Sequence, residues 1–293
     1  MNGPEGLATR FEAHRDHLRG VAYRMLGSLD DAEDAVQAAW LRVDRAGVDG
    51  VENLAGWLTT VVARVCLDML RIRRTRGEES LTSIPEAVLE RPGGIEPEQE
   101  AVLAESVGRA LLVVLDRLTP AERVAFVLHD LFAVPFAEIA PVVGRTTVAS
   151  KKLASRARER VRGPVTPDEA ERAEDYGVVD AFLSAARGGD LDTLLRVLAP
   201  DVVRVADRFA VPDGVTRDVR GARAVAEETR IFAHRARAGE PALVDGRPGI
   251  VIAPNGRLFA ALRLTIEAGR ITRIEVIADP ARLAELPLAV TGI

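Results

Sequence analysis

The spacing of apolar residues changes once along the chain, near residue 163, and this change constrains the fold most. Before it, apolar residues recur at helical spacing, as at Leu18, Val21, Ala22, Met25 and Leu26. After the segment Gly163–Pro167, two helical stretches are followed by short alternating stretches at 202–206, 249–252, 258–266 and 271–277. Asn255-Gly256 is typical of a hairpin turn, and residues 267–270 offer a second turn. The pattern predicts all-α modules followed by an α+β domain with helices on one face of an antiparallel sheet.

Length and composition allow two or three globular domains. The 293 residues are 47% hydrophobic and 28% charged, an ordinary balance for chains that bury a core. No run of about 18 apolar residues predicts a membrane helix, and the charged start of the chain is unlike a signal peptide. We therefore expect a cytoplasmic protein without a membrane partner.

The one cysteine and the scattered histidines argue against disulfide and metal chemistry. Cys66 lies in an apolar stretch and is expected to be a buried structural thiol. His14 and His17 stand three apart on a predicted helix, but no further ligand candidate adjoins them. The sequence therefore predicts no metal site and no cofactor.

Charge is distributed unevenly, although the net charge is only −5. From Arg145 to Arg162 there are seven basic residues against one acidic residue, and four arginines gather at 71–76. Acidic residues concentrate at 30–34. Such alternation suits a protein that joins a basic protein partner to DNA.

A helix-turn-helix is predicted in the basic part of the chain. A capping box at Thr119–Glu122 starts one helix, and a short helix over Phe136–Val143 ends at Gly144. A basic helix then reaches about Arg162. On this helix we expect a basic face and a core face, formed respectively by Ser150, Lys151, Ser155, Arg158 and Arg162 and by Val148, Leu153, Ala157 and Val161.

Several motifs in series resemble the extracytoplasmic-function (group IV) sigma factors. Asp31-Ala-Glu-Asp-Ala-Val-Gln37 with Trp40-Leu41 is similar to the polymerase-binding segment of that family. Leu54-Ala-Gly-Trp-Leu58 through Arg74 resembles its −10 recognition helix. The −35-binding domain is matched by the stretches at 115–123, 135–140 and 153–158.

The C-terminal part resembles a SnoaL-like (NTF2-like) cone, which one group of these sigma factors carries. The resemblance lies in Phe182–Asp190 and Leu198–Val202. That group has a Pro-Glu motif in its linker, matched by Ile84, Pro85 and Glu86, and a late motif matched by Asp279-Pro-Ala-Arg-Leu283. The alternative interpretation is that Asp279-Pro280 merely ends the last strand.

The resemblance implies an alternative sigma factor that directs RNA polymerase core to promoter DNA, modulated by its fused C-terminal domain. It implies sigma region 2 at 8–76, a linker at 77–98, region 4 at 99–163 and the regulatory domain at 172–284. The pocket of the cone is a candidate site for a small-molecule ligand. No catalytic residues are expected.

The same resemblance, with the charge pattern, assigns candidate residues to each surface. The residues expected to bind polymerase are Asp31, Glu33, Asp34, Gln37, Trp40 and Leu41. Binding of the −10 element falls to Asn53, Arg64, Asp68, Arg71, Arg73 and Arg74. Binding of the −35 element falls to Arg145, Thr147, Ser150, Lys151, Lys152, Ser155, Arg156 and Arg158. Contacts between linker and C-terminal domain fall to Ile84, Pro85, Glu86, Asp279, Pro280 and Leu283.

Four departures from the family pattern change local expectations. Val65 stands where the family usually has an asparagine, and Ala38 stands where it usually has an acid. Pro141 should kink or shorten the first helix of the helix-turn-helix. The glycine-rich segment of the group's C-terminal domain is replaced by the sequence at 207–213.

Two other classes of function compete with this reading. A one-component, ligand-sensing helix-turn-helix regulator would leave residues 10–75 without a role. An enzyme is the second alternative, since Asp207, Asp213 and His234 offer acid-base groups, but their spacing specifies no reaction.

Overall fold

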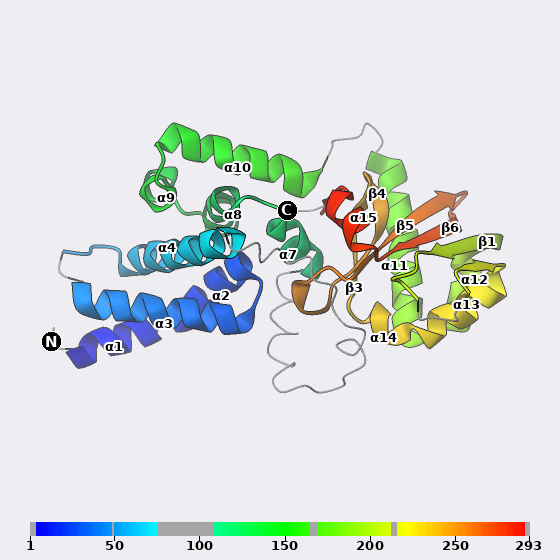
Figure 1. The fold of residues 1–293 in the computed structure, drawn as a ribbon, viewed down its shortest axis with the longest axis horizontal. Helices are drawn as coiled ribbons and strands as arrows, with labels where there is room; N and C mark the ends of the chain where they lie inside the picture. The colour runs from blue at the N-terminus through cyan, green and yellow to red at the C-terminus, as the bar shows by residue number, and fades with distance from the viewer. Residues whose placement is uncertain (1–3, 49, 76–107, 164–168, 212–215, 291–293) are drawn as a thin grey trace. The chain divides into compact units, whose positions relative to one another are not determined.

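The computed structural model describes residues 4–48, 50–75, 108–163, 169–211 and 216–290 (Figure 1). By packing, the chain divides into two units. The first comprises residues 1–80 and 115–160, and the second comprises residues 81–114 and 161–293. Each unit is described separately below.

The described part of the first unit is helical. Its helices are α1 (Pro4–Glu12), α2 (Arg15–Leu26), α3 (Leu29–Ala46), α4 (Leu54–Thr75), α8 (Pro120–Phe126), the π-helical turn η1 (Val127–Leu131), α9 (Phe136–Val143) and α10 (Thr147–Arg162). Helices α2, α3 and α4 pack together, and α8 and α9 pack against α4. The apolar stripes seen in the sequence form this core: Leu18, Val21, Val36, Val62 and Val124 are all fully buried.

Caps fix where these helices begin and end. Gly27 ends α2 in the left-handed conformation, and the Ser28 hydroxyl then accepts a hydrogen bond from Asp31 N, starting α3. The predicted capping box is confirmed, because Thr119 and Glu122 satisfy each other's backbone N–H groups at the start of α8. The predicted short helix is also present, with Pro141 inside it and Gly144 ending it.

The second unit is an α+β domain, as the sequence predicted. Its elements are α7 (Arg109–Asp116, by its first residues), α11 (Glu169–Gly188), α12 (Leu191–Val197), β1 (Leu198–Ala206), β2 (Asp218–Arg220), α13 (Ala222–Ile231), α14 (Ala233–Ala236), β3 (Gly239–Val244), β4 (Arg247–Ile252), the 3₁₀ turn η2 (Pro254–Gly256), β5 (Ala260–Glu267), β6 (Arg270–Ile277), α15 (Pro280–Glu285) and β7 (Leu288–Ala289). The strand order is β2-β1-β6-β5-β4-β3-β7, antiparallel throughout except for the parallel pair β1 and β6.

Helices α11, α12 and α13 cover one face of this sheet. Val179, Phe182 and Leu194 from the helices share a core with Leu264 and Ile274 from the strands. Both predicted turns are present: η2 joins β4 to β5, and Ala268 and Gly269 join β5 to β6 with positive φ at both residues.

The second unit also includes residues of the helical part of the chain. Ala110 N in α7 donates a hydrogen bond to the Glu240 carboxylate in β3, and Val290 N donates to Val161 O at the end of α10, at 2.8 Å. A Cβ at Gly256 would lie 2.6 Å from Leu112 Cδ1. Residues near the described start of the predicted region 4, Ala110 and Leu112, and near its end, Val161, therefore pack within the second unit.

Candidate polymerase and nucleic-acid interfaces

Helix α3 presents a mixed acidic and apolar stripe to solvent. Asp34, Gln37 and Leu41 are exposed and stand at i, i+3 and i+7, so they lie on one side of the helix. Leu41 is 48% exposed, which is unusual for a side chain of this size. Trp40 is half-buried instead, with its ring 5.1 Å from the Phe11 ring. Three of the six predicted polymerase-binding residues thus form one accessible surface.

The other acids of this set are engaged inside the unit. Asp31 forms an ion pair with Arg73 of α4, whose Nη1 also donates to Leu26 O at 3.3 Å. Glu33 forms ion pairs with Arg15 at 3.4 Å and with Arg19 at 3.3 Å, both on α2. These carboxylates tie α3 to its neighbours.

Helix α4 carries the predicted −10 residues on its outer side. Arg64, Asp68 and Arg71 are exposed at i, i+4 and i+7, and Arg74 is exposed one turn after Arg71. Asp68 accepts a hydrogen bond from Arg42 of α3 at 3.5 Å. Val65, at the position where the family usually has asparagine, is 3% exposed and belongs to the core.

The loop before α4 is shaped by Asn53. Its Oδ1 accepts a hydrogen bond from Gly56 N at 3.1 Å and so caps the helix. A Cβ at Gly56 would lie 2.6 Å from Asn53 Nδ2, so the Asn53 side chain would have to shift if this residue carried a Cβ. Asn53 itself is exposed.

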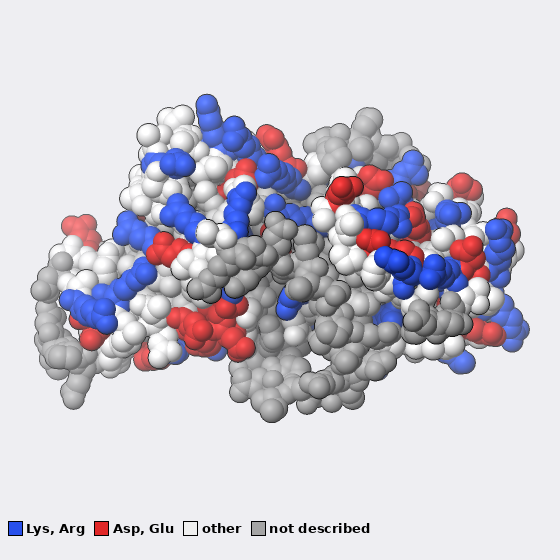
Figure 2. Space-filling model, viewed as in Figure 1, with Lys and Arg blue, Asp and Glu red and all other residues white. Residues whose placement is uncertain are grey.

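Helix α10 has an exposed polar and basic face. Thr147, Lys151, Lys152, Ser155 and Arg156 are all exposed, and Arg145 is exposed in the turn before the helix. Figure 2 shows lysine and arginine side chains along α10 and acidic side chains gathered over the part of the molecule where α3 lies. A positive helix of this kind suits phosphate and base-edge contacts in a major groove.

Two expectations for α10 are wrong. Ser150 is fully buried, and its hydroxyl donates to Thr146 O at 3.0 Å, so it is no candidate for reading bases. Val148, expected in the core, is 66% exposed. Both errors have one cause: the helix begins at Thr147 and is rotated so that Ser150, Ala154, Ala157 and Val161 form the buried face.

Ion pairs hold the rest of α10 in place. Arg158 Nε donates to Asp130 of η1 at 2.7 Å, and this hydrogen bond raises the pKa of Arg158. Arg160 Nη1 donates to Glu122 of α8 at 2.6 Å. Arg158 is therefore a predicted contact to the −35 DNA that also holds α10 against η1.

The predicted regions 2 and 4 pack against each other within the first unit. Arg123 of α8 is 3% exposed, donates to Asp116 at 3.1 Å, and would lie 3.5 Å from a Cβ at Gly27. Burial in this interior raises the pKa of the Cys66 thiol on α4 to about 12. Nearby, the His17 ring of α2 meets the Phe132 ring edge-on, with 5.3 Å between centroids.

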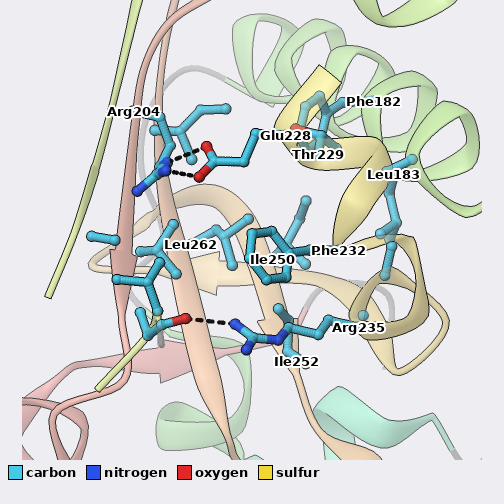
Figure 3. A pocket seen from close by; sticks show the side chains of 18 residues that line it. Phe182, Leu183, Arg204, Glu228, Thr229, Phe232, Arg235, Ile250, Ile252 and Leu262 are labelled. Atoms are coloured by element: carbon cyan, nitrogen blue, oxygen red, sulfur yellow. Dashed lines mark hydrogen bonds and ion pairs between the residues drawn. The ribbon is translucent and has the colours of Figure 1, made fainter. Parts of the chain in front are cut away.

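The second unit forms a partly open cavity of about 110 Å³ lined by its sheet and by helices α11, α13 and α14 (Figure 3). Its walls are mainly apolar, with Phe182, Leu183, Phe232, Ile250 and Ile252 among the labelled side chains. Four polar side chains also line it, namely Arg204, Glu228, Thr229 and Arg235.

The polar groups of the cavity are bound within the fold. Arg204 forms a two-point ion pair with Glu228, and its Nη1 donates to Arg217 O at 2.9 Å. The Thr229 hydroxyl donates to Val225 O at 2.8 Å. Arg235 donates to Ala210 O at 2.5 Å and lies over the Phe232 ring. Both carboxylate oxygens of Glu228 are thus engaged by Arg204.

The residues of the enzyme alternative do not meet in this cavity. Asp207 accepts backbone hydrogen bonds from Phe209, Ala210, Ala278 and Asp279. His234 is absent from the cavity wall, and Asp213 lies outside the described residues.

The predicted interdomain residues are only partly described. Ile84, Pro85 and Glu86 lie outside the described residues. Asp279 caps α15 by accepting from Ala281 N at 2.9 Å, with Pro280 as the first helical residue, and Leu283 is 4% exposed. A helix cap thus follows β6 at this motif, and the short strand β7 comes after the helix.

The described residues show neither a membrane-spanning helix nor a metal-binding cluster. Among them, no helix has the length and apolar character needed to cross a membrane. Within the same residues, no cluster of three or more His, Cys, Asp or Glu side chains is placed to hold a metal ion.

Comparison with known proteins covers the whole chain. Residues 10–76 match the family model of Sigma-70 region 2, and residues 108–161 match that of Sigma-70, region 4. The chain is 36% identical over 299 residues to the "Probable ECF RNA polymerase sigma factor SigI" of Mycobacterium tuberculosis, covering 100% of both chains. It is 38% identical over 298 residues to the "ECF RNA polymerase sigma factor SigJ" of the same organism, covering 96% of this chain and 94% of the relative.

A solved structure adds a similar match. The crystal structure of Mycobacterium tuberculosis SigJ covers 94% of this chain and 97% of its own, with 33% identity and a TM-score of 0.46. The two region matches and the full-length identities agree with the motifs in the sequence. This chain belongs to the extracytoplasmic-function family of RNA polymerase sigma factors.

Proposed function

We propose that this alternative sigma factor binds RNA polymerase core through α3 and places α4 and α10 on the −10 and −35 elements of a promoter. The supporting observation is that one chain exposes an acidic and apolar stripe on α3 and separate basic faces on α4 and α10. Region 2 is proposed at 8–76, the linker at 77–98 and region 4 at 99–163. Because polymerase acts in the cytoplasm, we place the chain there too.

A transcription assay tests this assignment. Purified core polymerase and host genomic DNA are expected to give discrete start sites, sharing paired upstream elements, only when this chain is added. Leu41→Asp is expected to lower initiation about tenfold or more, because it places a charge on the large apolar side chain of the proposed contact. Ile231→Asp is the matched control, since it places the same charge at an apolar side chain that is 71% exposed and lies in α13 of the second unit. Initiation that depends equally on both positions, or none at all, would contradict the proposal.

We also propose that the C-terminal domain, at 172–284, restrains region 4. The contacts of Glu240 with Ala110 and of Val290 with Val161 support this, because they hold both ends of the module. In the same assay Glu240→Ala is expected to change the yield of transcript, and Glu267→Ala, an exposed glutamate of β5, is expected to leave it unchanged. An unchanged yield in both variants would remove the support for this role.

The cavity of the C-terminal domain is proposed to hold a small, neutral and mainly apolar molecule rather than to catalyse a reaction. Arg204 pairs with Glu228, Thr229 and Arg235 donate to backbone carbonyls, and apolar cavities of roughly this size bind single aromatic rings. Toluene is expected to raise Tm, and benzoate is not, because its charge would be desolvated. Ala210→Leu, which fills the cavity, should abolish the shift; a stronger effect of benzoate would contradict the proposal.

A further inference from the structure

Val148 is an exposed, branched apolar side chain on the first turn of the basic helix α10. Two thirds of it, 66%, is accessible, the second highest value among the exposed large hydrophobic residues described. The next residues of the turn point elsewhere: Ala149 is half-buried and Ser150 is fully buried. Thr147 and Val148 are therefore the two outward side chains of this turn.

Helix formation does not account for a valine at this position. Thr146 already caps the helix, since its hydroxyl accepts from Ala149 N at 3.2 Å and its carbonyl accepts from Ser150 N at 2.9 Å. A β-branched residue is only a moderate helix former. The side chain adds no contact to the core of the first unit, because that face is formed by Ser150, Ala154 and Ala157.

The surroundings of Val148 match a base-reading position. Lys151 and Lys152, one turn further along, are exposed and suited to phosphates or to guanine edges. The N-terminal residues of a recognition helix are the ones that reach base edges in the major groove. There the single apolar group that a base offers is the 5-methyl of thymine.

We propose that Val148 packs on the 5-methyl group of a thymine in the −35 element and so contributes to promoter choice. This inference rests on the proposed function, because it takes α10 as the helix that enters the groove. Burying one methyl group stabilises a complex by an amount that corresponds to about a fourfold change in binding. We therefore expect initiation from this promoter to fall about fourfold when either the thymine methyl group or the valine side chain is removed.

The test removes the methyl group from the DNA and the valine from the protein in turn. A promoter mapped in the genomic assay is synthesised with each −35 thymine replaced singly by deoxyuridine, which keeps base pairing and lacks the methyl. Holoenzyme with wild-type chain, Val148→Ala or Ile231→Ala is then assayed by single-round transcription. Ile231 is the control because it is 71% exposed and lies in the C-terminal domain.

The expected result is a non-additive pair of effects. At one position uracil lowers wild-type initiation about fourfold, and Val148→Ala loses that dependence while initiating about fourfold less on the thymine promoter. Ile231→Ala keeps the wild-type pattern. Three outcomes would overturn the inference. The wild-type chain could initiate normally on every uracil-substituted promoter, or the −35 element could consist of G·C pairs alone. Val148→Ala could also keep the dependence on the thymine methyl group. Absence of initiation by wild-type chain would overturn the proposed function and this inference with it.

Discussion

Cys66 shows how closely single side chains are enclosed in the first unit. Burial raises the pKa of its thiol to about 12, with Arg123 of α8 acting in the opposite direction. Because only the thiolate reacts with alkylating reagents, we expect this thiol to be almost unreactive at pH 8 in the folded chain.

Iodoacetamide is therefore expected to leave Cys66 unmodified in native protein at pH 8 and to label it once urea unfolds the first unit. Mass spectrometry of samples taken across a urea series measures the labelled fraction. Ser155→Cys supplies an exposed thiol on α10 in the same chain, which should react rapidly without urea. Equal labelling of both thiols in native protein would show that the interior around Cys66 opens readily.

At the scale of elements, the sequence predicts those features that a few neighbouring residues determine, such as helix caps and turns. The capping box at Thr119, the helix end at Gly144 and the turn at Ala268-Gly269 each depend on a few neighbouring residues, and each is confirmed. The α+β class also follows from local periodicity. The strand Gly239–Val244 was not predicted, because Gly239 and Pro241 disfavour a strand and its pairing with β4 and β7 is set by the fold.

Surfaces were harder to predict than elements, because they depend on the rotation of a helix about its axis. On α10, Ser150 and Val148 exchange their expected faces, since the helix is rotated so that Ser150, Ala154 and Ala157 face the core. On α3, the sequence places Asp31 and Asp34 in one acidic cluster. Only the fold shows that Asp31 meets Arg73 while Asp34 stays exposed. Partners far apart in sequence decide which predicted residues are accessible.

Across the whole molecule, the two packing units begin and end at different residues from the matched family regions. The family model of region 4 spans residues 108–161, whereas residues 108–114 and 161–163 pack with the C-terminal domain. The ends of the DNA-binding module are thus built into the domain proposed to restrain it. A ligand in the cavity of that domain would act on the same unit that holds these ends.

The ion pair between Asp31 and Arg73 yields a prediction for the complete chain. Asp31→Asn should raise the affinity of polymerase-free chain for single-stranded −10 DNA by about two- to fivefold, since a partly exposed pair contributes about 0.5–1 kcal/mol. Fluorescence anisotropy at fixed low salt measures this. Asp34→Asn is the matched control, because Asp34 is exposed on the same helix. Unchanged affinity in Asp31→Asn would show that the pair does not limit Arg73.

This pair would link the two proposed binding events thermodynamically. A polymerase that engaged Asp31 would release Arg73, so we expect the chain bound to polymerase to hold promoter DNA more tightly than the same chain alone. By reciprocity, promoter DNA that engaged Arg73 would strengthen the binding of Asp31 to polymerase by the same factor. We therefore expect polymerase and promoter to act as positive heterotropic effectors of each other, which would keep idle sigma factor from occupying promoters that no polymerase has reached.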